Sequence, residues 1–257
     1  MEDEKNLPET EEFDPEEERE YWQKRLEEGD ANGYYYLSRL CEYEGKMDES
    51  AKYFVKAIAA EQPDAMYWMS ELCQEEGSDW YDPAEAENYR RKAADGGCVA
   101  AMLSMGDHAL CDGDAPFYEE NDGTLEQRSR HFAQFEWYKK AAEAGEAALM
   151  LSIADAYRTG YPVPVNPEKA FDWYMKGVEV AKDLACVCPV ARCFEIGFGI
   201  EKDEETAVEY YELAAGYGVE EAIRRLSEIY TDGLGSVSPD PEKAGQYRKI
   251  LEENGEN

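Results

Sequence analysis

The sequence has few of the residues and motifs that mark enzymes and membrane proteins. It contains two histidines, His108 and His131, so it offers few candidates for a general base or a metal ligand. The motifs Gly-x-Ser-x-Gly, His-Glu-x-x-His, Ser-x-x-Lys and Gly-Lys-Ser/Thr do not occur. No run approaches the roughly 20 apolar residues that a transmembrane helix needs. These absences argue against the common hydrolases, the P-loop nucleotidases and a membrane-spanning protein, and we expect no cofactor.

Basic residues are also scarce. The 257 residues include 59 acidic and 26 basic side chains, which gives a net charge of −33. Nucleic acid and anionic membrane surfaces would be repelled by this charge and are not expected as partners. Residues 1–20 alone carry a net charge of −9 and few apolar side chains, so we predict an acidic disordered tail over residues 1–14. The remaining chain is apolar enough, at 43% overall, to form a folded core.

The cysteines give no sign of a disulfide framework. Seven cysteines occur without paired spacing, and the first ten residues have no apolar segment typical of a secretory signal. We therefore expect a reduced protein in the cytoplasm. The densest group is Cys186, Cys188 and Cys193, which could begin a metal or thiol-dependent site, although the spacing is not Cys-x-x-Cys. Our favoured interpretation is that these cysteines are small core residues.

An internal repeat is the strongest signal in the sequence. Aromatic residues recur as anchors at spacings of 32 to 48 residues, and most are followed eight positions later by glycine: Tyr21, Tyr53, Tyr89, Trp137, Trp173, Tyr210 and Tyr247. Small residues flank most anchors on one helical face, and a second apolar helical pattern lies between one turn and the next anchor. Each period therefore predicts two antiparallel helices, giving about six helix-turn-helix hairpins after an opening helix. Pro189 stands inside one expected helix and predicts a kink or a late start there.

The repeat resembles a known family. The run Arg192-Cys-Phe-Glu-Ile-Gly-Phe-Gly-Ile-Glu-Lys-Asp203 and the segment Glu168-Lys-Ala-Phe-Asp-Trp-Tyr174 are similar to the Sel-one-like repeat, a relative of the tetratricopeptide repeat. The resemblance covers residues 15–257. It implies an all-α, right-handed superhelical α-solenoid that acts as an adaptor or scaffold for other proteins and is not an enzyme.

One segment interrupts the repeat, near residues 112–128. It contains five carboxylates between Asp112 and Gly123, which suggests a calcium loop. The required fifth and sixth positions, however, hold Pro116 and Phe117, so the calcium pattern fails. We predict an acidic surface loop whose Phe117-Tyr118 pair could contact a partner.

The candidate binding surface is the groove that first helices line in tetratricopeptide-like stacks. The positions expected to face inward place an apolar stripe beside an acidic line, and the candidate residues are Tyr35, Arg39, Tyr67, Glu71, Leu103, Asp107, Leu151, Asp155, Arg224 and Glu228. Such a surface suits an extended basic peptide with apolar anchors. The alternative for the stripe is that it packs between adjacent hairpins. The alternatives for the function are an acidic chaperone or decoy for basic proteins and, less favoured, a thiol- or metal-dependent enzyme.

Overall fold

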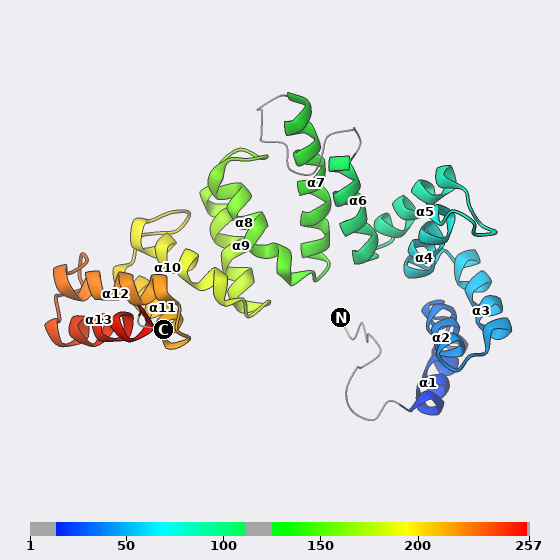
Figure 1. Cartoon of the computed structure of the whole chain (residues 1–257), viewed down its shortest axis with the longest axis horizontal. Coiled ribbons are helices and arrows are strands. Elements are labelled where there is room, and N and C mark those ends of the chain that lie inside the picture. The colour runs from blue at the N-terminus through cyan, green and yellow to red at the C-terminus, as the bar shows by residue number, and fades with distance from the viewer. Residues whose placement is uncertain (1–13, 112–124, 256–257) are drawn as a thin grey trace. The chain divides into compact units, whose positions relative to one another are not determined.

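The computed structural model describes residues 14–111 and 125–255, and these residues form helices joined by short connections (Figure 1). The α-helices are α1 (Pro15–Glu27), α2 (Asn32–Tyr43), α3 (Met47–Ala59), α4 (Pro63–Gln74), α5 (Pro83–Asp95), α6 (Val99–Cys111), α7 (Leu125–Glu143), α8 (Met150–Thr159), α9 (Pro167–Glu179), α10 (Val187–Ile196), α11 (Glu204–Gly216), α12 (Glu220–Asp232) and α13 (Pro241–Gly255). No strand occurs within these two ranges. The predicted all-α repeat of helix-turn-helix hairpins is confirmed.

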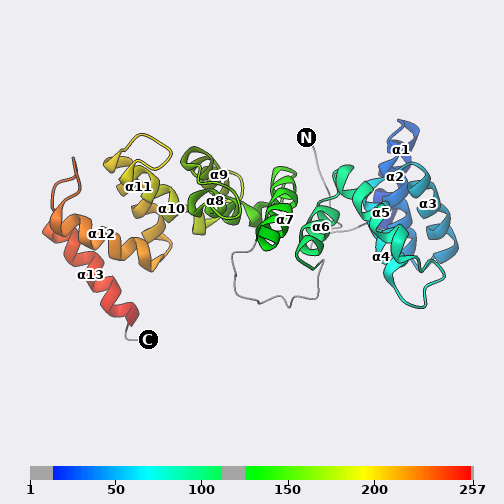
Figure 2. The ribbon, with the colours of Figure 1, turned by 90° about the horizontal axis from the view of Figure 1, so that it is seen from above.

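The chain divides into two compact units, Met1–Met105 and Gly106–Asn257, with the boundary inside α6. In unit 1, α1 packs on α2, and the pairs α2/α3 and α4/α5 form hairpins. In unit 2, the hairpins are α8/α9, α10/α11 and α12/α13, which follow one another in Figure 2. The predicted acidic tail and most of the predicted acidic loop lie outside the described residues, as do Phe117 and Tyr118. One solenoid over residues 15–257 stays a prediction.

Helix starts follow the Asp-Pro and Asn-Pro signals in the sequence. Asp14, Asp82, Asn166 and Asp240 each accept a hydrogen bond from a backbone N–H in the first turn, with N···O distances of 2.8 to 3.2 Å. The proline that follows each of these residues occupies the first helical position, where a missing N–H costs nothing. The capping side chains therefore fix where α1, α5, α9 and α13 begin.

Helix ends follow the repeated glycine position. Gly145 lies in the short turn after α7 and has a φ of 123°, a value that residues with a Cβ rarely adopt. The equivalent position in the first hairpin is Glu61, whose φ is 55°, so the turn keeps its left-handed conformation even without glycine. After α9 the left-handed residue is Lys182, one position later than the repeat predicts. Each of these turns therefore contains a left-handed residue, although that residue need not be glycine and its position can shift by one.

Pro189 lies in the first turn of α10, directly after a 3₁₀ turn over Leu184–Cys186. The late start predicted for this helix is therefore present, and the proline needs no hydrogen-bond donor there. However, α8 begins after a similar 3₁₀ turn, Ala147–Leu149, without any proline. The late start is a property of both repeats rather than a consequence of Pro189.

Small residues in the core let neighbouring helices approach each other closely. Ala170, Ala207 and Ala214 have no exposed surface, and they lie on the same helical faces as the aromatic anchors. Gly177 of α9 is in close contact with Cys186, because a Cβ added to Gly177 would overlap the Sγ atom of Cys186. A cysteine at position 186 is small enough to fit the gap between the helices. Burial of these apolar side chains stabilises the stack.

Candidate functional site

The ten candidate binding residues lie on α2, α4, α6, α8 and α12, two on each helix. Tyr35, Tyr67, Leu103 and Leu151 are half-buried, and Leu151 packs against the core of unit 2. The exposed members are Glu71, Asp107, Arg224 and Glu228. The sequence also assigns Val187 to the apolar stripe, at the repeat position of Tyr35 and Leu151; Val187 is buried in the core, so the stripe is not uniformly accessible along unit 2.

Unit 1 contains a shallow apolar hollow of about 180 Å³, which we call the aromatic hollow; it is lined mainly by Tyr35, Arg39, Met47, Phe54, Trp68 and Leu72. Arg39 stacks over Trp68, with its guanidinium carbon 4.4 Å from the ring centroid, and also pairs with Glu42 at 2.6 Å. Trp68 and Met47 are exposed. The hollow thus presents an apolar surface in which the only cation is already engaged by two neighbours.

Tyr67 does not line this hollow, although the sequence placed it beside Tyr35. Its hydroxyl makes a side-chain hydrogen bond with Ser104 of α6. Burial raises the pKa of Tyr67, and the charge of Glu71 acts in the same direction. Tyr35 and Arg39 therefore line one hollow, whereas Tyr67 contacts α6 instead.

In unit 2, tyrosines on the second helices donate hydrogen bonds to carboxylates on the first helices. Tyr174 of α9 donates to Asp155 at 2.6 Å, Tyr211 of α11 donates to Glu195 at 2.8 Å, and Tyr138 of α7 donates to Asp107. Burial raises the pKa of Tyr138 to about 12, with the hydrogen bond to Asp107 adding to the effect. Burial and the acceptor carboxylates also raise the pKa values of the other two tyrosines. These hydroxyls stay protonated and hold the carboxylates in place.

These tyrosines occupy one position of the repeat, directly after the aromatic anchor, which we call the donor slot. In the remaining hairpins the slot holds Phe54, Arg90 and Arg248. Arg248 donates to Thr231 at 2.6 Å, whereas the Arg90 side chain is 1% exposed and, among the described residues, bonds Glu87 alone, at 3.0 Å. Its Nε and Nη2 atoms are buried without a hydrogen-bond partner. Leaving buried donors unsatisfied destabilises a fold, so this slot is satisfied in unit 2 and strained in unit 1.

Arginines reinforce the held carboxylates in unit 2. Arg225 of α12 pairs with Glu195 and, at 2.6 Å, with Glu228. Burial alone would raise the pKa of Glu195, but the hydrogen bonds from Arg225 and Tyr211 outweigh it and lower the pKa. Arg158 pairs with Asp155 at 2.9 Å. The acidic line predicted from the sequence is thus partly neutralised inside the protein.

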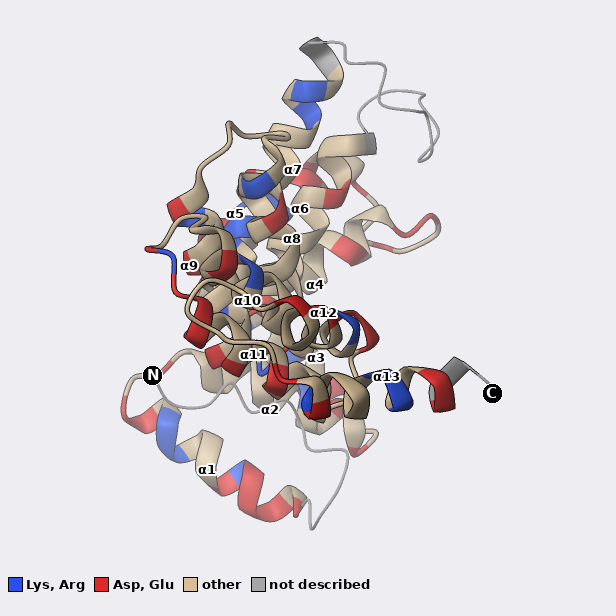
Figure 3. Cartoon of the chain, turned by 90° about the vertical axis from the view of Figure 1, so that its left-hand side faces the viewer, with Lys and Arg blue, Asp and Glu red and all other residues tan. Residues whose placement is uncertain are grey.

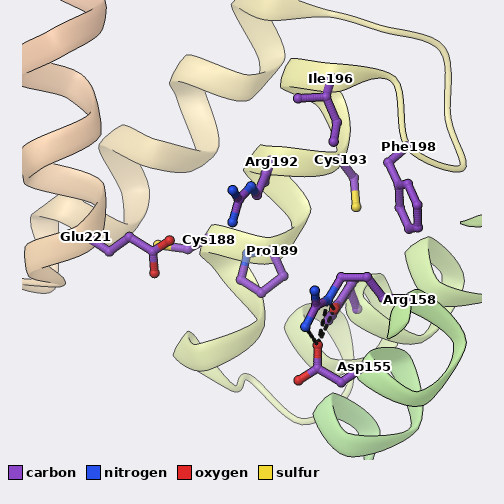
Figure 4. A pocket seen from close by; sticks show the side chains of 10 residues that line it. Asp155, Arg158, Cys188, Pro189, Arg192, Cys193, Ile196, Phe198 and Glu221 are labelled. Atoms are coloured by element: carbon purple, nitrogen blue, oxygen red, sulfur yellow. Dashed lines mark hydrogen bonds and ion pairs between the residues drawn. The ribbon is translucent and has the colours of Figure 1, made fainter. Parts of the chain in front are cut away.

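Two adjoining hollows of about 470 and 380 Å³ lie over α8, α10 and α12. We call their combined surface the arginine groove; both hollows are lined by Arg192, Ile196 and Glu221. Figure 4 shows Arg192 projecting from α10 on one side of Pro189, with Arg158 and Asp155 joined on the other side. Acidic and basic residues alternate on α12 and α13 (Figure 3). The groove as a whole contains four arginines and four carboxylates, so its charge is balanced.

Sequence reasoning identified Asp155, Arg224 and Glu228 of this groove and missed Arg158, Arg192 and Ile196. The donor slot left a visible signal, since Trp-Tyr or Tyr-Tyr occurs at Trp137, Trp173 and Tyr210. Arg192 was missed because the turn after α9 is one residue longer than the repeat predicts; counted from Lys182, Arg192 occupies the same position as Asp155 and Glu228.

The cysteines behave as core residues, as predicted. Six of them are described, and all six are buried. Burial raises the pKa of Cys186 to about 12 and the pKa values of Cys188 and Cys193 to about 11. Across the described ranges, no group of histidine, cysteine and acidic side chains is arranged to hold a metal ion. Protonated, buried thiols lack the thiolate character that nucleophiles and metal ligands require.

The hairpin stack defines the chain as a helical-repeat protein, and the comparison with known families specifies the repeat. Segments that match the Sel1 repeat model cover residues 63–98, 135–146, 145–179, 187–216 and 220–247, more than half of the chain. The chain belongs to the Sel1 repeat family. Proteins of this family are generally scaffolds for protein interactions and are typically non-enzymatic.

Two curated relatives match part of the chain. Chitin synthase regulatory factor 2 of Schizosaccharomyces pombe is 31% identical over 107 residues, which are 41% of this chain and 21% of that protein. Activator of C kinase protein 1 of Saccharomyces cerevisiae is 34% identical over 100 residues, 36% of this chain and 16% of that protein. The match thus spans about a fifth or less of each relative.

Solved structures show similar repeats. A Sel1 repeat protein from Oxalobacter formigenes is 22% identical, with a TM-score of 0.48 over 92% of this chain and 99% of that one. A protective antigen of uropathogenic Escherichia coli with an SLR fold is 21% identical, with a TM-score of 0.48 over 94% of this chain and 58% of that one. In the parts of the chain that are described, no helix has the length and apolarity to cross a membrane.

Proposed function

We propose that this chain is a cytoplasmic, non-enzymatic scaffold that binds an extended peptide or protein segment on the faces of its first helices. Membership of the Sel1 repeat family supports an interaction role. The observation that carries the proposal is the arginine groove, which runs over three successive first helices and joins apolar to charged side chains. Such concave surfaces over stacked hairpins are typical binding sites of repeat proteins.

Each unit offers a part of the proposed surface. In unit 1, Tyr35, Trp68 and Met47 form an apolar site for an anchor side chain, and the nearby Glu71 is exposed to attract a basic residue of the partner. In unit 2, Asp155, Arg224 and Glu228 border the arginine groove. Leu103 and Leu151 stay in the proposal as half-buried members of the apolar stripe. The proposed partner therefore presents apolar anchors together with charged residues.

Selection from a library of displayed random peptides on the purified chain tests this proposal. We expect enriched peptides that lose binding to Trp68→Ala, which empties part of the aromatic hollow, by tenfold or more. Trp80→Ala is the matched control, because Trp80 is exposed in the connection between α4 and α5 and lines none of the described hollows. Circular dichroism checks that both variants fold. Failure to enrich any peptide, or enriched peptides whose binding changes neither with Trp68→Ala nor with Arg192→Gln in the arginine groove, would contradict the proposal.

An acidic chaperone or decoy gives a different result in the same assay. Binding driven only by the net charge of −33 would favour any basic peptide, fall steeply as salt is raised and ignore Trp68→Ala. Binding to a shaped hollow keeps most of its affinity in salt, since the apolar contacts are not screened.

A further inference from the structure

We propose that the arginine groove binds an internal aspartate or glutamate of an extended peptide through Arg192, with a neighbouring apolar residue of the peptide against Ile196. This inference rests on the proposed peptide-binding function and specifies the chemistry of the ligand in unit 2. It differs from the basic partner that the net charge suggests.

Arg192 differs from the other arginines of the groove. Arg158 pairs with Asp155, Arg224 pairs with Glu220, and Arg225 pairs with Glu195 and Glu228. Arg192 is exposed, lines both hollows and forms no hydrogen bond or ion pair with any residue that the structure describes. Its planar guanidinium therefore keeps its donors for a ligand, and this geometry matches a carboxylate through two parallel hydrogen bonds.

The nearby carboxylates form no hydrogen bond or ion pair with Arg192 in the described part of the chain, although the charge of Arg192 contributes to the lowered pKa of Glu195. Asp155 is held by Tyr174 and Arg158, and Glu195 is held by Tyr211 and Arg225. Glu221 lines the same hollows, yet Figure 4 shows it extending from α12 with no interaction drawn to Arg192. The hydrogen bonds from buried tyrosines thus keep two carboxylates on the walls of the groove and leave its central cation available.

The shape of the groove favours an internal side chain over a chain terminus. The hollows of about 470 and 380 Å³ continue on either side of Arg192, so a peptide bound at this residue can extend in both directions. Ile196 is 60% exposed beside Arg192, and the half-buried Phe198 lies on the same hollow. These side chains supply an apolar contact next to the cation.

The local charge also permits an anionic group. The four arginines of the groove balance its four carboxylates, in a chain whose net charge is −33. Repulsion from more distant carboxylates is screened over about 8 Å at physiological ionic strength. An acidic side chain that would be repelled elsewhere on the protein can therefore approach Arg192.

The peptide selection described above, repeated with Arg192→Gln as the counter-selection target, tests the inference. We expect peptides specific to the wild type to share an acidic residue next to an apolar one. For one such peptide, Arg192→Gln should weaken binding about tenfold or more, Arg192→Lys less, and Arg91→Gln not at all. Arg91 is the matched control because it is exposed on α5, outside the groove.

A peptide in which the acidic residue is replaced by its amide completes a double-mutant cycle. We expect this amide peptide to bind the wild type and Arg192→Gln equally well, because the ion pair between Arg192 and the acidic residue is absent in both complexes. Enriched peptides that depend on Trp68 but ignore Arg192 would overturn this inference and leave the proposed function standing. Failure to enrich any peptide would overturn both. An effect of Arg192→Gln that persists with the amide peptide would show that Arg192 does not contact the acidic residue.

Discussion

The two units use the same hairpin differently at the donor slot. In unit 2 the slot holds Tyr138, Tyr174 and Tyr211, which connect the second helices to carboxylates on the first helices. In unit 1 it holds Phe54, which packs without donating, and Arg90, whose buried nitrogens are partly unsatisfied. The same position of the repeat therefore contributes to a charged network in unit 2 and, as Phe54, to the aromatic hollow in unit 1.

The two units also differ in how their charged side chains are held within the protein. In unit 2 the candidate carboxylate Asp155 is held by Tyr174 and Arg158, and Glu195 is held by Tyr211 and Arg225. In unit 1 the Arg39–Glu42 pair is more exposed than the Arg225–Glu195 pair and joins neighbouring turns of one helix. A partly buried ion pair that joins two helices, such as Arg225–Glu195, stabilises the stack. A more exposed pair within one helix, such as Arg39–Glu42, contributes little to stability.

The largest expected effect is the loss of a held carboxylate in unit 2. Glu195→Ala should lower the free energy of unfolding by about 2–3 kcal/mol, since it removes one of the two carboxylate partners of Arg225 and leaves the buried Tyr211 hydroxyl without its acceptor. Urea unfolding followed by circular dichroism measures this. The control in unit 1, Glu42→Ala, should cost less than about 0.5 kcal/mol. Equal losses would show that the units do not differ in this respect.

Arg90 gives the next effect, with the opposite sign. Arg90→Met should raise the free energy of unfolding by about 1–2 kcal/mol, because an apolar side chain of similar length removes the unsatisfied buried donors. Glu87 keeps Arg91 as a partner, at 2.9 Å. The exposed Arg91→Met is the control and should change little in the same urea experiment. Destabilisation by Arg90→Met would mean that the guanidinium is satisfied in solution.

Removing one tyrosine hydroxyl should have a smaller effect. Tyr174→Phe should lower the free energy of unfolding by about 1 kcal/mol, the usual net value of one hydrogen bond, since Asp155 retains Arg158. Tyr53→Phe, at an anchor position of unit 1, removes a hydroxyl that makes no described hydrogen bond. Thermal unfolding of the two variants should separate them, and equal melting temperatures would argue against a role for the donor slot.

The smallest effect is a dependence on pH. Because the pKa of Glu195 is lowered in the folded protein, its contribution is complete above the ordinary pKa of 4.5 and is lost as the pH falls through the lowered value. Glu195→Gln should flatten the acid limb of the stability curve by about 1 kcal/mol or less. Urea midpoints measured from pH 7 down to pH 3 follow this change. An unchanged acid limb would contradict the lowered pKa.

Much of the fold could be predicted from particular residues. Asp-Pro and Asn-Pro pairs fixed four helix starts, and the spaced glycines fixed the turns, because capping and left-handed turns depend on local sequence. The apolar stripe was less predictable. Tyr35 lines a hollow, Val187 is buried, and the sequence pattern is the same for both, since burial depends on the neighbouring hairpin.

The sequence by itself determined the hairpin repeat, the helix boundaries and the use of cysteine as a small core residue, all of which follow from local spacing and side-chain size. The tertiary structure alone decided which charges are paired. Tyr211, Glu195 and Arg225 come from three different helices, so no sequence spacing brings them together. Because pairing in space consumes donors and acceptors, only the folded chain shows that Arg192 keeps its own.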